Sequence, residues 1–269
     1  MIKYLISICI VCAICCQSKD KHLKNDIKNN HEPIVYKTIQ LNSKVNKNLR
    51  FYYIKGLSGH PLYIPSDSTI KIFSSDPILL IKPDNNQVVY YVRPGDNVII
   101  NKENDDIVFQ ISDSIRTNEA NFFAALSEST GSVRYLGTNS YLSKKINMRE
   151  RDSIIEEKKI NRIQYFTNYI KNKIVSDEFK KFVKESITFI AIHEKLSLYY
   201  PGYNTKQIST YYKDSIEKYL SIFNENDNLK NLFYIDALIQ LSRVFLKEES
   251  KIPHVFFFKF VGQGIIYNL

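Results

Sequence analysis

The chain has 269 residues, of which 44% are hydrophobic and 24% are charged. This composition is typical of a globular protein with a substantial core, and it excludes a largely disordered chain. The formal net charge is +9, but the Lys residues are interleaved with Asp and Glu, as in Glu156-Glu157-Lys158-Lys159. Because there is no compact basic run, we interpret the charge as a solvated surface and expect no nucleic-acid partner.

Residues 1–15 have the pattern of a lipoprotein signal peptide. Lys3 supplies a positive charge, and an apolar stretch then runs from Tyr4 to Cys16, where it meets a polar and charged segment. A helix that crosses a bilayer needs roughly 20 apolar residues, so this stretch is too short for one. The pattern therefore predicts export and cleavage rather than a transmembrane helix.

The lipidation site is predicted at Cys16. The peptidase that cuts lipoproteins needs a short side chain before the cysteine, and Cys16 follows the small Cys15. By contrast, Cys15 follows the bulky Ile14, and Cys12 follows Val11. Acylation of Cys16 would anchor the protein to the inner or the outer membrane of the cell envelope, facing the periplasm or the surface.

All four cysteines lie in this leader, so the two C-x-x-C patterns there are interpreted as chance rather than as redox or zinc motifs. Disulfides, thiol catalysis and cysteine-based metal sites are then excluded from the exported body. Residues 16–33 are rich in Lys, Asn and Asp without apolar periodicity, and they are predicted to form a flexible tether.

Residues 34–115 are predicted to form an antiparallel β-sandwich. Short β-branched and aromatic runs alternate with turn signals such as Pro83-Asp84-Asn85-Asn86 and Arg93-Pro94-Gly95-Asp96. Ser58-Gly59-His60 is interpreted as another turn. The pattern predicts about seven strands, over residues 35–41, 49–54, 69–73, 77–81, 87–92, 98–100 and 107–111.

Residues 116–248 are predicted to be helical, which makes the fold class α+β. Apolar residues recur at helical spacing over 118–126, 149–174, 176–200, 205–223 and 227–247. Ser176, followed by Asp177-Glu178, has the pattern of a helix start, with a side-chain cap and an acidic first turn. The apolar C-terminal tail, 249–269, is interpreted either as a strand that returns to the sandwich or as aberrant sequence after a truncation.

No residue of the chain is predicted to be catalytic, to bind a cofactor or to bind a metal. The histidines lack metal-ligand spacing, and His193 is interpreted as a core or boundary residue of a helix. The carboxylates Asp84, Asp96, Asp105 and Asp106 fall in predicted loops without the spacing of a calcium loop. No G-x-S-x-G turn is present. The abundant Tyr and Phe are expected mainly in the core, with a ligand groove as the alternative.

Three segments of the body, together with the leader, give the chain a resemblance to a known family. They are Arg93-Pro94-Gly95-Asp96-Asn97-Val98-Ile99-Ile100, Asn118-Glu119-Ala120-Asn121-Phe122-Phe123 and Ser176-Asp177-Glu178-Phe179. With them, residues 1–248 resemble the N-terminal portion of thioredoxin-like lipoproteins of the TlpA/ResA type found in Bacteroidetes. The resemblance implies a lipid anchor, a β-sandwich and a helical region ahead of a thioredoxin domain.

The chain departs from that family at its redox centre. The family's thioredoxin domain carries a W-C-x-x-C motif, whereas this chain has no Trp and no cysteine after Cys16. Thiol–disulfide oxidoreductase activity is therefore not expected in it. The leading hypothesis is a non-catalytic, membrane-anchored envelope lipoprotein that binds a partner protein or a small ligand. In one version of this hypothesis, the chain is a truncated relative of the redox lipoproteins. The alternatives are a hydrolase that uses loop carboxylates and a structural or assembly lipoprotein.

Overall fold

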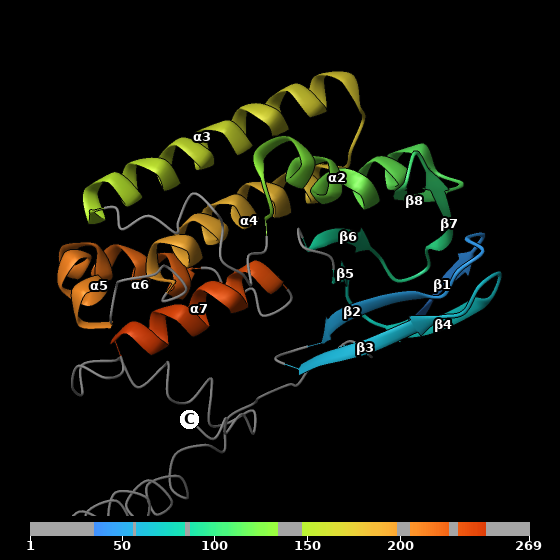
Figure 1. Cartoon of the computed structure of the whole chain (residues 1–269), viewed down its shortest axis with the longest axis horizontal. Helices are drawn as coiled ribbons and strands as arrows, with labels where there is room; N and C mark the ends of the chain where they lie inside the picture. The colour runs from blue at the N-terminus through green and yellow to red at the C-terminus, as the bar shows by residue number, and fades with distance from the viewer. Residues whose placement is uncertain are drawn as a thin grey trace, which may run out of the picture. The chain divides into compact units, whose positions relative to one another are not determined.

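The computed structural model describes residues 35–55, 58–83, 87–133, 147–197, 205–225 and 231–245. The predicted signal peptide, tether and C-terminal tail lie outside these ranges. The described chain has two four-stranded sheets followed by a helical region (Figure 1), which confirms the predicted α+β class. The described residues from Tyr36 onward belong to one compact unit.

The sandwich consists of two sheets that combine strands from different parts of the sequence. Sheet A has the order β4-β1-β7-β8, and sheet B has the order β3-β2-β5-β6. In the described ranges the strands are β1 (Lys37–Ser43), β2 (Leu49–Lys55), β3 (Ser58–Ile64), β4 (Thr69–Ser74), β5 (Ile78–Lys82), β6 (Val88–Val92), β7 (Asn97–Glu103) and β8 (Asp106–Ile111). Neighbouring strands are antiparallel except β1 and β7, which are parallel with Gln40 beside Asn97.

The interpretation of Ser58-Gly59-His60 as a turn was wrong. These residues begin β3, which pairs with β2 along its whole length. The following Pro61 lies opposite Tyr52. Proline is tolerated there because β3 is the last strand of sheet B, and an edge strand leaves every second backbone N–H outside the ladder.

The sandwich core lies between the two sheets. Alternate residues of each strand point into it, as the alternation of Ile39 and Leu41 with exposed or half-buried neighbours shows for β1. Tyr90 stacks on Phe109, with ring centroids 4.1 Å apart, and its hydroxyl donates to the carbonyl of Ile107 at 2.7 Å. The one polar group of this stack is therefore satisfied inside the core.

Strands β5 and β6 are buried on both faces, which explains their unbroken apolar sequences. Leu80 and Tyr90 face the sandwich core, whereas Leu79 and Tyr91 face a second core shared with the helices. Such double burial requires apolar residues at successive positions rather than at alternate ones. The helical region therefore packs on sheet B through these two strands.

Helix α2 (Ser114–Thr130) closes the side of the sandwich between β6 and β8. Asp113 caps its start by accepting from the backbone N–H of Ile115 at 2.8 Å. Asn121 then accepts from the N–H of Phe109 at 2.9 Å and donates to its carbonyl at 2.6 Å. Thr117 makes the same pair of bonds with Ile111. These side chains satisfy the edge of β8 as a neighbouring strand would.

The remaining helices build the second core. In the described ranges they are α3 (Met148–Asn172), α4 (Asp177–Leu196), α5 (Thr205–Tyr211), the short 3₁₀ turn η2 (Lys213–Ser215), α6 (Ile216–Glu225) and α7 (Leu232–Phe245). Ser176 caps α4 through the N–H of Phe179 at 3.2 Å, as predicted. The single helix predicted over 205–223 is instead α5, η2 and α6. No helix of the described ranges is long and apolar enough to cross a membrane.

Candidate functional site

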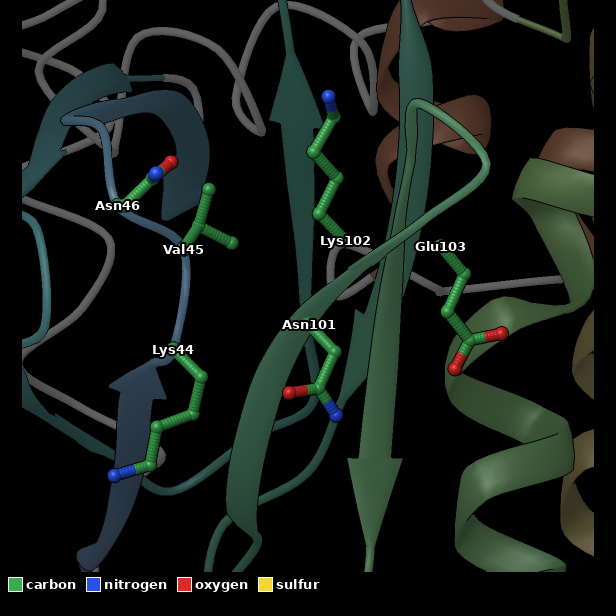
Figure 2. Close-up of a pocket in the computed structure, with 6 residues that line it drawn as sticks. All are labelled: Lys44, Val45, Asn46, Asn101, Lys102 and Glu103. Atoms are coloured by element: carbon green, nitrogen blue, oxygen red, sulfur yellow. The ribbon is translucent and has the colours of Figure 1, made fainter.

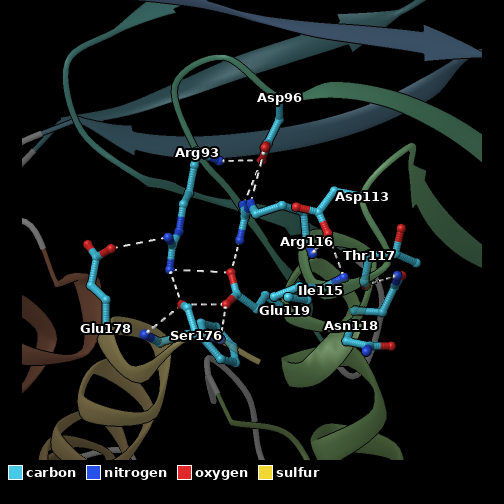
Figure 3. Close-up of polar contacts among 12 residues, drawn as sticks. Arg93, Asp96, Asp113, Ile115, Arg116, Thr117, Asn118, Glu119, Ser176 and Glu178 are labelled. Atoms are coloured by element: carbon cyan, nitrogen blue, oxygen red, sulfur yellow. Dashed lines mark hydrogen bonds and ion pairs between the residues drawn. The ribbon is translucent and has the colours of Figure 1, made fainter. Parts of the chain in front are cut away.

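The three motifs of the body meet where the sandwich joins the helices, and we call this cluster the junction: Arg93, Asp96, Arg116, Glu119, Ser176 and Glu178 (Figure 3). It starts with a tight turn between β6 and β7. Gly95 has φ +96°, a conformation that side-chain-bearing residues rarely adopt. The N–H of Asp96 donates to the carbonyl of Arg93 at 3.0 Å, and the Asp96 carboxylate accepts from the N–H of Arg93 at 2.6 Å.

Arg116 of α2 connects this turn to the helix. Its Nε and Nη2 donate to the two oxygens of Asp96 at 3.2 and 2.7 Å, a bidentate pair. Its Nη1 contacts Glu119, one turn later on the same helix. Both partners are buried, since the side chain of Asp96 is 8% exposed and that of Glu119 is fully enclosed.

Glu119 connects α2 to the start of α4. One of its oxygens accepts from the backbone N–H of Ser176 at 2.8 Å and from its hydroxyl at 2.6 Å. The other oxygen lies 3.3 Å from Nη2 of Arg93. One enclosed carboxylate therefore binds the turn, its own helix and the cap of the next helix.

Arg93 completes the junction on the solvent side. It pairs with Glu178 at 3.1 Å and donates to the Ser176 hydroxyl at 3.0 Å. The guanidinium carbons of Arg93 and Arg116 lie 5.5 and 5.6 Å from the ring centre of Tyr91. Burial is the main cause that raises the pKa of Tyr91, although the two cations act in the opposite direction. The phenol therefore stays neutral.

The junction is suited to holding elements together rather than to reacting. Its three carboxylates face two guanidinium groups, and every one of these charges has an oppositely charged partner within the cluster. A nucleophile or general base needs a group whose reactive atom is open to substrate. Glu119 is fully enclosed, and Asp96 is engaged on both oxygens, so neither is available.

A second ionic cluster fixes the C-terminal end of α4. Arg162 of α3 forms a bidentate pair with Glu194, both contacts at 2.9 Å. Burial acts to raise the pKa of Glu194, but Arg162, with smaller contributions from Lys158 and His193, holds this pKa below its ordinary value. Arg151 donates to the backbone carbonyls of Glu194, Lys195 and Ser197 at 2.7, 2.9 and 3.0 Å. It thereby satisfies carbonyls that a helix end leaves without partners.

Lys195 lies beside this cluster and also has partners. Its Nζ is 3.0 Å from Asp152 and 2.5 Å from Glu156. Burial alone would lower the pKa of Lys195, but these two carboxylates raise it above the ordinary value. The amine is therefore held protonated, the opposite of what a nucleophilic lysine requires.

An open polar hollow of about 480 Å³ lies between the residues that follow β1 and the C-terminal end of β7 (Figure 2). It is lined by Lys44, Val45, Asn46, Asn101, Lys102 and Glu103. Lys102 pairs with Asp105 at the tip of the hairpin that joins β7 and β8. The hollow is open to water, so it is suited to binding a polar ligand rather than to a water-excluding reaction.

The structure separates the carboxylates that the sequence left as hydrolase candidates. Asp96 precedes β7 and Asp105 follows it, and a strand of seven residues spans about 23 Å at 3.3 Å per residue. Paired carboxylates of glycosidases lie roughly 5–9.5 Å apart. Asp96 therefore does not pair with Asp105 or with its neighbour Asp106. Asp84 and the predicted lipidation site Cys16 lie outside the described residues.

Two histidines considered in the sequence, His193 and His60, lie in packed positions. His193 is half-buried on α4, and His60 stacks on Tyr53 with ring centroids 5.1 Å apart. In the described ranges, no group of three His, Cys, Asp or Glu side chains could hold a metal ion. Most helical aromatics, such as Phe122 and Phe179, are buried, as expected.

Searches against protein-family models, curated proteins and solved structures found no match.

Proposed function

We propose that the protein is a lipid-anchored lipoprotein of the cell envelope whose body is a non-catalytic binding module. The anchor is inferred from the leader, with Cys16 as the acylated residue, and the partner is an envelope protein or a small ligand. One observation supports the non-catalytic role above others. The junction uses Asp96 and Glu119, its two most buried carboxylates, to join the sandwich to the helices.

The junction also supports kinship with the N-terminal portion of the TlpA/ResA-type lipoproteins. The three segments that carry this resemblance are separated by up to 83 residues in the chain, yet Arg93, Glu119 and Ser176 bond to one another. A set of distant residues that must fit together is a stronger reason for kinship than each short segment alone. Kinship would extend to architecture and anchoring, and not to the redox activity, whose motif this chain lacks.

A rigid body suits a module that presents a surface. Truncating one partner of a buried ionic cluster typically costs about 3–5 kcal/mol, so a well-paired cluster holds its elements in one arrangement. The junction fixes one end of α4, and the cluster of Arg151, Arg162 and Glu194 fixes the other. The sandwich and helices would then act as one platform raised from the membrane by residues 16–33.

The anchoring is tested by metabolic labelling of cells with an alkyne analogue of palmitate. The full-length protein is expected to take up label and to sediment with membranes, and Cys16→Ala is expected to lose both. Cys15→Ala is the matched control, because it places an Ala before Cys16 and should keep the label. Retained label in Cys16→Ala would contradict the assignment to that residue, and an unlabelled wild-type protein would contradict the lipid anchor altogether.

A further inference from the structure

The face of sheet A that points away from the sandwich core is unusually rich in side-chain amides. Five of its residues are Asn or Gln, and we call them the amide face: Gln40 and Asn42 on β1, Asn97 and Asn101 on β7, and Gln110 on β8. The strand register places them together. Gln40 lies beside Asn97, and Gln110 lies beside Ile99 of the same face.

Hydrogen bonds hold these amides in fixed orientations. The Oδ1 of Asn42 accepts from Gln40 Nε2 at 3.0 Å and from the hydroxyl of Thr69 at 2.8 Å. Its Nδ2 donates to Asn97 Oδ1 at 2.6 Å and to the carbonyl of Val98 at 3.1 Å. Asn42 is thus the centre of the network. Because these side chains are already ordered, binding a ligand to them costs less side-chain entropy than binding to mobile side chains would.

The outer members of the network keep unused hydrogen-bonding groups. Asn101 Nδ2 donates to Gln110 Oε1 at 3.1 Å, which leaves Asn101 Oδ1 as an acceptor and Gln110 Nε2 as a donor. In the same way, Gln40 Oε1 can accept and Asn97 Nδ2 can donate, since neither atom has a partner among the described residues. The face therefore offers neutral donors and neutral acceptors side by side.

The chemistry of the face favours an uncharged ligand with many hydroxyl groups. Each hydroxyl both donates and accepts, which matches alternating amide donors and acceptors. Charged residues are few on this face: Lys71 on the edge strand β4 lies opposite Gln40, and Glu103 and Asp106 lie opposite each other at the hairpin end. An anionic polymer would instead require clustered cations.

Two exposed apolar side chains on this face could pack against sugar rings. Phe73 of β4 is 65% exposed and Ile99 of β7 is 38% exposed, and their neighbours across the strands on β1 are the polar Thr38 and Asn42. A protein interface would need a larger apolar centre. An exposed aromatic ring, by contrast, offers a flat surface on which the apolar face of a sugar can pack beside the amides.

We propose that the outward face of sheet A binds a neutral glycan, an inference that rests on the proposed role of the body as a binding module. Four strands at about 4.8 Å spacing make the face about 14 Å wide, so it suits an oligosaccharide rather than a single sugar. Asn101 also lines the hollow between β1 and β7, which extends the polar surface beyond the sheet. The ligand class is therefore an uncharged oligosaccharide chain that lies across β1 and β7.

The test is isothermal titration calorimetry on the full-length protein purified in detergent. The probes are neutral hexasaccharides of glucose, of mannose and of N-acetylglucosamine, with polygalacturonate as the anionic comparison. The wild-type protein is expected to bind at least one neutral probe with Kd below about 1 mM. Gln110→Ala and Asn97→Ala are each expected to weaken that binding about fivefold to tenfold, the effect of one lost hydrogen bond.

Matched controls are Asn161→Ala and Asn168→Ala, which remove exposed side-chain amides from α3 and should leave Kd unchanged. If Asn97→Ala fails to fold by circular dichroism, Gln110→Ala decides alone, because within the described ranges the Gln110 side chain bonds to Asn101 and to no other residue.

The inference is overturned if no neutral probe binds at about 1 mM, if only polygalacturonate binds, or if the controls weaken binding as much as the face variants. Palmitate labelling separates this result from the proposed anchor. Label without glycan binding refutes only the glycan, and glycan binding without label refutes only the anchor.

Discussion

Glu119→Gln is the most informative single change in the junction, because it keeps the shape of the side chain and removes its charge. The amide still accepts from Ser176 at one oxygen, but it no longer neutralises Arg93 and Arg116. Breaking a buried ion pair costs about 3–5 kcal/mol. Both cations keep a second carboxylate, Glu178 or Asp96, so we expect the lower end of that range, about 3 kcal/mol.

The loss is measured as the free energy of unfolding in urea, followed by far-ultraviolet circular dichroism. For a unit of this size, about 3 kcal/mol corresponds to a Tm lower by about 6–12 °C. Glu178→Gln is the matched control, since it removes a carboxylate that is 71% exposed and pairs with the same Arg93. It should cost under about 1 kcal/mol. Equal losses in the two variants would refute the argument that burial gives Glu119 its importance.

Three further predictions concern other parts of the scaffold. Gly95→Ala should lower the free energy of unfolding by about 1–2 kcal/mol, because an alanine is strained at φ +96°. The new Cβ meets nothing closer than 3.8 Å, so a steric clash is not the cause. An unchanged urea midpoint would contradict this prediction. Asn121→Ala leaves the backbone groups of Phe109 at the edge of β8 without their partner. We therefore expect the free energy of unfolding to fall by about 2 kcal/mol, and light scattering to show concentration-dependent aggregation. A monodisperse variant of wild-type stability would count against the edge-capping role. The pKa of Glu194 is below its ordinary value of 4.5, so the unfolded chain binds this proton more readily than the folded protein does. The contribution of the pair with Arg162 is therefore complete above about pH 5 and is lost as pH falls through the lowered pKa. The stability difference between wild type and Glu194→Gln should shrink on acidification from pH 7 toward pH 3, and a difference that stays constant over this range would show that the charge is not the cause.

Local patterns predicted the elements well where burial follows one simple period. The strand around Ile39 and Leu41 follows from alternate apolar residues. The apolar stripes that contain Phe122 and Phe179 follow from helical spacing, and the cap at Ser176 follows from its residue type. The predictions failed where partners distant in sequence decide the outcome. The parallel pairing of β1 with β7 cannot be read from either strand, and β3 was missed because Gly59 and Pro61 have the composition of a turn.

The ionic clusters were missed for a related reason. Arg151 and Arg162 lie in a segment of dense charge, where a charged residue normally faces water. A signal was nevertheless present, because they fall on the same helical stripe as Ile155 and Phe166, the buried residues of α3. The role of Glu119 had no comparable signal, since its partners Arg93 and Ser176 are brought to it only by tertiary packing. The amide face was missed because Asn and Gln on a strand look like ordinary solvated positions.

The position of α2 also sets how copies of the protein can meet. The helix occupies the side of the sandwich at β6 and β8, so among the described residues only β3 and β4 offer backbone groups to another chain. Each sheet can therefore be extended at one edge only, so neither sheet can continue through one molecule to a third copy. Continuous growth of either sheet would therefore stop after two copies, because α2 closes the opposite edge of each.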